Sequence, residues 1–124
     1  MKNRSLGERI GFALAGWRAA WRRERSFRTQ AIAALLALVA LLILWPAPIW
    51  WAIVALTCAL VLALELINSA LEAVIDMIHP GLHPEIKAAK DMLAGAVLAI
   101  SVAALVVAAA MIIQRAPELL EGLI

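Results

Sequence analysis

Charge, cysteine and glycine-rich loops are the scarce features of this sequence. Only 16% of its 124 residues are charged, whereas 65% are hydrophobic. A soluble domain of this length could not cover so much apolar surface, so the composition favours one compact membrane domain. The single cysteine, Cys58, excludes an intrachain disulfide framework. No histidine–cysteine cluster suggests zinc, and no glycine-rich phosphate loop or kinase-loop motif suggests a conventional nucleotide site.

The positive charge is concentrated near the N-terminus. Eight of the eleven Lys and Arg residues fall at or before Arg28. Such a basic segment can bind nucleic acid, but the apolar remainder of the chain makes the cytoplasmic face of a membrane the better partner. We therefore expect membrane binding and no nucleic-acid binding.

Residues 6–24 predict an amphipathic helix that lies in the membrane interface. One face carries Leu6, Ile10, Leu14, Trp17 and Trp21, and the other carries Glu8, Arg18, Arg22 and Arg23. Cationic side chains toward headgroups and apolar side chains toward acyl chains are typical of surface helices. If the helix is regular to its end, Glu24 projects on the apolar side, near Leu6 and Trp17.

Three apolar segments, 27–45, 48–77 and 85–113, are predicted to cross the bilayer. The prolines and tryptophans of 45–51 separate the first two, because proline ends one helix and starts the next and tryptophan favours the interface. Pro80 and Gly81 predict the second turn. The mixed tail after Ile113 is expected on the surface. We therefore expect an all-α integral membrane protein, one domain over 1–124, with three transmembrane helices and an N-terminal amphipathic interfacial helix.

The distribution of charge also predicts the topology. Three spans put the N-terminus and the 77–91 loop on the same side of the membrane. Ten of the eleven basic residues lie on that side, and only Arg115 lies on the other. The positive-inside rule makes the first side cytoplasmic.

A polar stripe occupies the cytoplasmic end of the second span. Within an arc of roughly 100° at 100° per residue, one helix face carries Glu65, Asn68, Ser69, Glu72 and Asp76. A carboxylate in the hydrocarbon core costs about 2.5–3.5 kcal/mol on insertion scales, so such residues usually mark a functional site. Glu65 lies sixteen residues past Ile49, about 24 Å along the axis and near the cytoplasmic boundary of a roughly 30 Å core.

These groups suit phosphoryl transfer. Mg²⁺ binds through one or two carboxylates plus substrate phosphates, a lysine such as Lys90 can hold phosphate oxygens, and a further carboxylate can take a proton from a lipid hydroxyl. A small cation-coupled transporter with Glu65 as carrier is the alternative from another class. The carboxylates cluster at one membrane face instead of the midplane, which argues against it. A non-catalytic assembly subunit is a third possibility.

Residues 65–76 resemble the signature of the prokaryotic diacylglycerol kinases, small three-span membrane enzymes. The family pattern E-x-x-N-[ST]-A-x-E-x-x-x-D is met at every fixed position, and further matches are Arg18-Ala19-Ala20-Trp21 before Glu24, Phe27-Arg28 and Ala89-Lys90-Asp91-Met92. Gln30 stands where some members carry glutamate. The resemblance implies an ATP-dependent diacylglycerol kinase of the bacterial inner membrane, with undecaprenol kinase as the nearest alternative. It also implies a homotrimer with sites shared between subunits.

The resemblance further implies roles for individual residues. Glu65 matches the general base that activates the lipid hydroxyl. Glu24 and Glu72 match the ligands of the Mg²⁺ that bridges the ATP phosphates, and Lys90 matches the phosphate-binding lysine. The other nucleotide contacts are implied at Phe12, Asn68, Gly81, Leu82, His83 and Asp91. Lipid-substrate contacts are implied at Arg18, Trp21, Phe27, Arg28 and Glu65.

Overall fold

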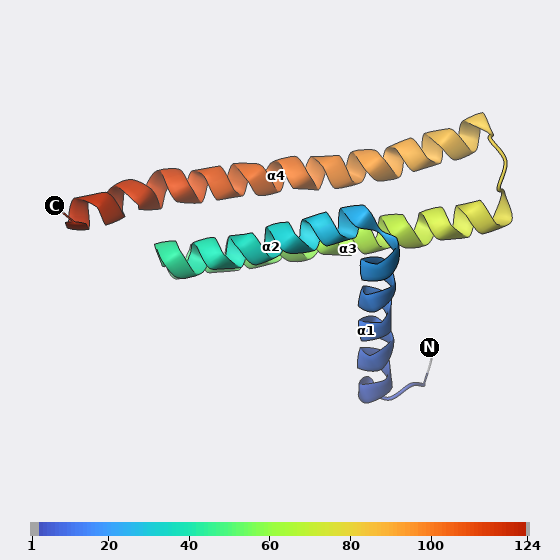
Figure 1. Ribbon diagram of the computed structural model, residues 1–124, viewed down its shortest axis with the longest axis horizontal. Coiled ribbons are helices and arrows are strands. Elements are labelled where there is room, and N and C mark those ends of the chain that lie inside the picture. The colour runs from blue at the N-terminus through green and yellow to red at the C-terminus, as the bar shows by residue number, and fades with distance from the viewer. Residues whose placement is uncertain (1–2, 124) are drawn as a thin grey trace.

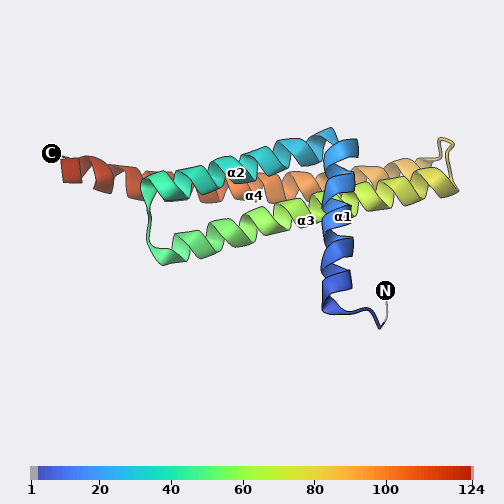
Figure 2. The ribbon, with the colours of Figure 1, turned by 60° about the horizontal axis from the view of Figure 1, so that its bottom comes forward.

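The computed structural model describes residues 3–123 as four helices with no strand among them. In chain order they are α1 (Leu6–Arg23), α2 (Arg25–Leu44), α3 (Pro48–Ile78) and α4 (Pro84–Leu123). The last three are each long and apolar enough to cross a membrane. They lie side by side, with α3 antiparallel to α2 and α4, and α1 extends crosswise from them (Figure 1, Figure 2). The expected all-α architecture with three candidate spans is therefore confirmed.

A local capping arrangement fixes the start of α1. Ser5 Oγ accepts a hydrogen bond from the Glu8 N–H at 3.2 Å, and Ser5 donates back to Glu8 Oε1 at 3.3 Å. The spacing is that of a capping box, but here only Ser5 satisfies a backbone donor of the first turn, and the Glu8 carboxylate bonds to the Ser5 hydroxyl. Arg4 adds an ion pair to Glu8 at 3.2 Å. The helix thus begins at Leu6, as the amphipathic pattern predicts.

The break between α1 and α2 falls at Glu24. A regular helix over 6–24 would direct this side chain toward Leu6 and Trp17, but α1 ends at Arg23. Glu24 has φ −118° and ψ 111°, an extended conformation, while its N–H still bonds to Ala20 O at 2.9 Å. One extended residue is enough to redirect the chain, so α2 starts at once in a new direction. Glu24 therefore belongs to the junction of two helices instead of the apolar face of one.

The opposite end of the bundle is tied together by polar side chains. Trp50 Nε1 donates to Gln114 Oε1 at 2.8 Å, and Arg115 Nε donates to the Leu44 carbonyl at 2.7 Å. Leu44 is the last residue of α2, where carbonyls lack intrahelical partners. The left-handed Trp45 (φ 43°) then turns the chain toward α3. These contacts join α2, α3 and α4 across the first turn.

The last helix is longer than its expected span. The sequence predicts a span over 85–113 and a surface tail, but α4 continues without a break to Leu123. Pro117 lies inside it and lacks the N–H that would bond four residues back. Arg115 and Glu118, which lie before and after Pro117, form an ion pair at 3.1 Å. The leucine and glutamate residues that follow are good helix formers. The tail is therefore a continuation of α4.

Few side chains are buried within one chain. Leu41, Val54 and Met111 form a small core between the three long helices, and Ala20 and Phe27 are buried at the α1–α2 junction. Large apolar side chains elsewhere on α2, α3 and α4 are exposed. A surface of this kind needs lipid or neighbouring subunits as its surroundings.

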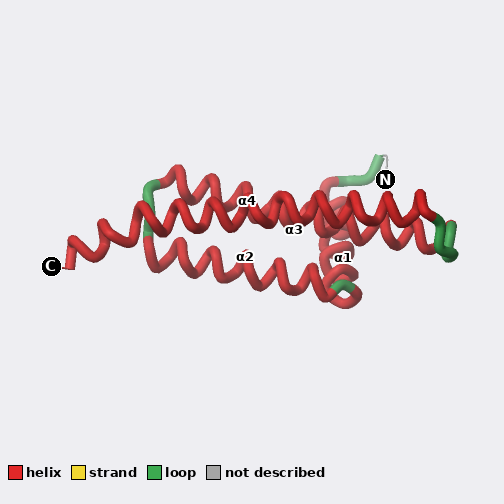
Figure 3. The backbone as a smooth tube through the Cα atoms, turned by 90° about the horizontal axis from the view of Figure 1, so that it is seen from above, coloured by secondary structure: helices red, strands yellow, loops and turns green. Residues whose placement is uncertain are grey.

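The ends of the long helices are staggered. From the turn at 79–83, α3 and α4 run together past the start of α2 (Figure 1, Figure 3). The α1–α2 junction consequently meets α3 partway along its length. The C-terminal part of α3, which carries the polar stripe, extends beyond the level at which α1 leaves the bundle.

Candidate active site at the α1–α2 junction

Glu65 is the one charged side chain that is buried among the described residues. It is 1% exposed, on α3 and beside the start of α2. Ser26 Oγ, in the first turn of α2, donates a hydrogen bond of 3.0 Å to Glu65 Oε2. A buried carboxylate carries a desolvation penalty of several kcal/mol unless it is paired, so apolar packing alone does not explain it. The role of Glu65 as general base stays a prediction.

Asn68, almost one turn further along α3, has a buried acceptor that is not satisfied. Its Oδ1 has no hydrogen-bond partner among residues 3–123. An orphaned buried acceptor costs roughly 1–3 kcal/mol, and such groups in native proteins usually have a partner from water, an ion, a ligand or another chain. The polar stripe therefore has unused acceptor capacity between Glu65 and Glu72.

A cavity of about 460 Å³ lies between α1 and α3. Glu24 and Arg23 line it from the end of α1, and Ser69 lines it from the polar stripe. The rest of the lining is apolar and consists mostly of small residues, with Trp17 and Leu66 as the two large side chains. The small residues are Ala13, Gly16, Ala19 and Ala20 on α1 and Ala70 and Ala73 on α3. Its volume lies in the range of small-molecule sites. The fold thus brings Glu24 and Ser69, one residue of the α3 stripe, to the same space.

Lys90 pairs with the last residue of the stripe. Its Nζ lies 2.5 Å from Asp76 Oδ1, which joins α4 to α3, and its side chain is 36% exposed. Asp91, a predicted nucleotide contact, pairs with Lys87 on its own helix at 2.7 Å. Exposed ion pairs contribute only about 0–1 kcal/mol, so an anionic ligand can displace either carboxylate. Lys90 is held beside the stripe, where phosphate oxygens are expected.

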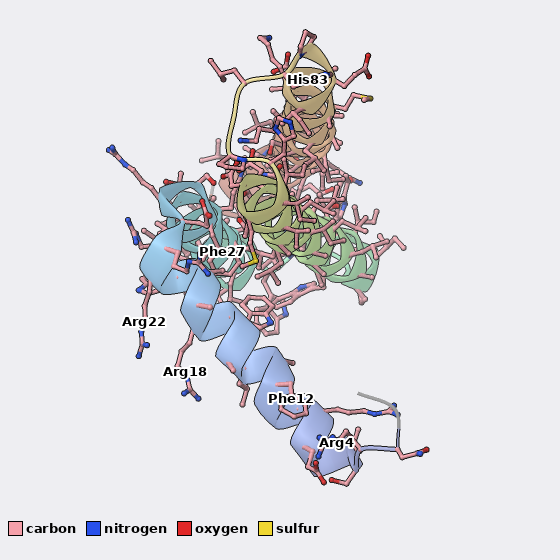
Figure 4. The ribbon with its side chains drawn as sticks, turned by 90° about the vertical axis from the view of Figure 1, so that its right-hand side faces the viewer. Arg4, Phe12, Arg18, Arg22, Phe27 and His83 are labelled. Carbon is pink, nitrogen blue, oxygen red and sulfur yellow. The ribbon has the colours of Figure 1, made fainter. Side chains whose placement is uncertain are left out.

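The turn residues Gly81, Leu82 and His83 are exposed at the far end of the α3–α4 hairpin. His83 Nδ1 accepts a hydrogen bond from the Glu85 N–H at 3.1 Å and so caps the start of α4. Phe12 lies on α1, 46% exposed, and well away from His83 (Figure 4). One chain therefore does not bring all of the predicted nucleotide contacts together.

The predicted lipid contacts divide into two groups. Arg18 and Trp21 are exposed on α1, and Arg18 projects away from the bundle (Figure 4). Phe27 is 1% exposed and packs edge-on against Trp17, with ring centroids 5.5 Å apart. Arg28 donates to the carbonyls of Trp21 (2.8 Å) and Arg22 (3.4 Å) at the end of α1. In this chain Phe27 and Arg28 make contacts within the junction, whereas Arg18 and Trp21 are exposed. The lipid-contact roles of these four residues and of the buried Glu65 stay predictions.

Sequence reasoning missed Ser26, and it noted Gln30 only as a departure from the family pattern; the structure places both side chains at this level. Ser26 contacts Glu65, and Gln30 Nε2 donates to Ser101 Oγ on α4 at 3.0 Å. Ser26 and Gln30 are four residues apart and so share one face of α2. Two polar residues at this spacing at the start of an apolar span are the signal that could have identified them.

The donor set is chemically suited to a hard cation. Among residues 3–123 no group of three or more His, Cys, Asp or Glu side chains gathers as a metal site. Mg²⁺ needs only one or two protein carboxylates when substrate phosphates and water complete its coordination. Glu24 and Glu72 are both partly exposed, and the orphaned Asn68 oxygen lies between Glu65 and Glu72 on the stripe. The chemistry of these donors therefore fits a magnesium–phosphate ligand, and their assembly around one ion stays a prediction.

Comparisons with known proteins show the family of this chain. The family described as prokaryotic diacylglycerol kinase matches residues 11–112. A diacylglycerol kinase of Escherichia coli (strain K12) is 40% identical over 88 residues, which cover 71% of this chain and 72% of that protein. A diacylglycerol kinase of Synechocystis sp. is 39% identical over 97 residues, 77% of this chain, and the match spans about half (55%) of its length. The undecaprenol kinase of Bacillus subtilis is 40% identical over 86 residues, 69% of each chain. This chain belongs to the prokaryotic diacylglycerol kinase family, a family of kinases.

Proposed function

We propose that this protein transfers the γ-phosphate of ATP to the hydroxyl of diacylglycerol at the cytoplasmic face of a bacterial inner membrane. The products are phosphatidic acid and ADP. The observation that carries the proposal is the buried Glu65 at the α1–α2 junction, within a motif that meets every fixed position of the family signature. Diacylglycerol is the substrate named for the Escherichia coli and Synechocystis relatives.

Glu65 is the proposed general base. The lipid hydroxyl reaches it from the bilayer, and the hydroxyl proton passes to a carboxylate oxygen as the lipid oxygen forms its bond to the γ-phosphorus. The bond between the γ-phosphorus and the β,γ-bridging oxygen breaks, and ADP leaves with that electron pair. Water then takes the proton from Glu65. A positioned base of this kind contributes about 10²–10⁴-fold to a rate, and no phosphoenzyme is required.

The nucleotide is proposed to bind where the stripe leaves the membrane. Glu24 and Glu72 would hold Mg²⁺, which when bound neutralises charge on the ATP phosphates. When the nucleotide binds, Lys90 would leave Asp76 and contact phosphate oxygens instead. The free energy lost with the Lys90–Asp76 pair is small, because the pair is exposed. Further proposed contacts are Phe12, Asn68, Gly81, Leu82, His83 and Asp91.

A homotrimer with shared sites is part of the proposal. Phe12 and His83 lie far apart in one chain (Figure 4), so a neighbouring α1 is needed to bring both to one nucleotide. Two further observations support contact with another subunit. The spans expose apolar faces, and the buried Asn68 oxygen has no partner among the described residues.

Undecaprenol is the second candidate acceptor, because the Bacillus subtilis relative named for it matches this chain as well as the Escherichia coli protein does. The chemistry is the same, since both acceptors are primary lipid alcohols. Turnover of the two lipids by the purified protein in mixed detergent micelles separates them. We expect preference for diacylglycerol, and preference for the prenol would overturn the proposed substrate.

The same assay tests the two alternatives from other classes, the transporter and the non-catalytic assembly subunit. A transporter has no function in detergent, where no gradient exists, and an assembly subunit has no activity and tolerates Glu65→Gln. ATP-dependent lipid phosphorylation in micelles is therefore the expected result. Its absence from folded, trimeric protein supplied with MgATP and both lipids would contradict the kinase proposal.

A further inference from the structure

Ser26 forms a hydrogen bond with Glu65, the proposed general base, and no sequence motif assigns a role to Ser26. Its hydroxyl donates to Glu65 Oε2 at 3.0 Å across 39 positions of sequence. We propose that Ser26 is a positioning residue, whose hydroxyl holds the Glu65 carboxylate in the orientation that receives the lipid proton. This inference rests on the proposed kinase function.

The geometry leaves one oxygen of Glu65 for chemistry. Within residues 3–123, the side-chain hydrogen bond to this carboxylate is made at Oε2. A glutamate side chain has three rotatable bonds, and its last torsion is broad unless a partner holds it. With Oε2 held by Ser26, the plane of the carboxylate is set, and Oε1 has no side-chain donor among the described residues. Oε1 is therefore the oxygen that we assign to the lipid hydroxyl. Because catalysis depends on near-attack geometry, a misplacement of about 1 Å can lower a rate about a hundredfold.

The turn that carries Ser26 is itself held from several sides. Its neighbour Phe27 is buried and packs against Trp17, and Arg28 bonds back to the carbonyl of Trp21. Ser26 also lies two residues after Glu24, where the chain changes direction. A serine in a first helical turn commonly bonds to nearby backbone groups, whereas this one reaches across to α3. These contacts hold the Ser26 hydroxyl at the α1–α2 junction, where it bonds to Glu65.

One turn deeper on α2, a second hydrogen bond provides a matched control. Gln30 Nε2 donates to Ser101 Oγ on α4, also at 3.0 Å and partly buried. It has the same length and also ties two helices through a serine hydroxyl, but it involves no carboxylate. Ser101→Ala therefore reports what the loss of such a bond does to the fold alone.

The experiment compares the full-length purified protein with Ser26→Ala, Ser26→Thr and Ser101→Ala, using MgATP and diacylglycerol in mixed micelles. We expect Ser26→Ala to lower kcat by about 10- to 100-fold, because bonds to charged groups are the stronger ones. The KM for MgATP should stay within about twofold, since Ser26 bonds to Glu65 and to none of the proposed nucleotide ligands. Ser26→Thr, which retains a hydroxyl, should restore most of kcat, and Ser101→Ala should stay near wild type.

A second arm separates positioning from folding. In a Glu65→Gln background, Ser26→Ala should cause no further loss, because the carboxylate it orients is absent. Wild-type kcat for Ser26→Ala in an active protein would overturn the inference while leaving the kinase function intact. It would also be overturned if Ser26→Ala lost activity only in proportion to its folded fraction, or if threonine failed to restore kcat in folded protein. An inactive wild type would instead overturn the proposed function itself.

Discussion

The polar groups at the two ends of the membrane bundle differ in how completely they are hydrogen-bonded. At the α2–α3 turn, Trp50 pairs with Gln114, and Arg115 pairs with the Leu44 carbonyl and Glu118. At the α1–α2 junction, one buried carboxylate has a single serine donor, and the Asn68 oxygen has no partner among the described residues. The first end uses its polar groups to close the bundle. The second end retains unused polar capacity, as expected of a site that awaits a ligand. Cavities do not separate the ends, because one lies between α1 and α3 and another runs between the long helices from Gln30 to Met111.

The largest effect is expected for Glu65→Gln, at the open end. The substitution keeps the shape and the ability to accept the Ser26 hydrogen bond but removes the base, so kcat should fall by about 10²–10⁴-fold. Folding and ATP affinity should be largely retained. Steady-state kinetics, with nucleotide binding measured separately, checks this. Near-normal turnover would refute the base role and weaken the contrast between the ends.

Glu72→Ala is expected to alter the metal dependence as well as the rate. The loss of one of two proposed carboxylate ligands should raise the apparent Mg²⁺ or MgATP requirement by about tenfold or more. Titration of activity against Mg²⁺ at fixed ATP measures it. An unchanged metal dependence would remove Glu72 as a ligand.

Lys90→Ala and Lys87→Ala form a matched pair on the same helix. Each lysine pairs with an aspartate, but only Lys90 reaches the stripe on α3. Lys90→Ala should raise the KM for MgATP by about tenfold through the loss of a charge-assisted phosphate contact, whereas Lys87→Ala should change it little. Equal effects from the two variants would argue that both lysines act only as surface charges.

The smallest effect on activity is expected at the closed end. Arg115→Ala removes the donor to the Leu44 carbonyl and should lower the free energy of unfolding by about 1–2 kcal/mol. Its kcat should match wild type once corrected for folded protein. Thermal unfolding in detergent beside the kinetic assay tests both statements. A specific loss of kcat at full stability would show that the two ends are coupled.

The sequence predicts the helices well because membrane spans are marked by long apolar runs with proline breaks. The level of Glu65 near the cytoplasmic boundary of the membrane stays a prediction, which follows from the constant rise of α3. The sequence does not predict that Glu24 falls in an extended break, because composition does not show where the backbone changes direction between two adjacent helices. The spacing of Ser26 and Gln30 marks a polar face at the start of α2, but the partner of Ser26 and the burial of Phe27 depend on how α1, α2 and α3 meet, which is a tertiary property.

The central claim is that the acidic end of α3 joins nucleotide and lipid at the cytoplasmic face. The most direct test supplies ATP labelled in its γ-phosphate to sealed membrane vesicles of known orientation that contain the protein and diacylglycerol. The account predicts labelled phosphatidic acid in inside-out vesicles, where ATP reaches the cytoplasmic face, and almost none in right-side-out vesicles until they are opened. Label appearing only in intact right-side-out vesicles, or in neither orientation after opening, would contradict it.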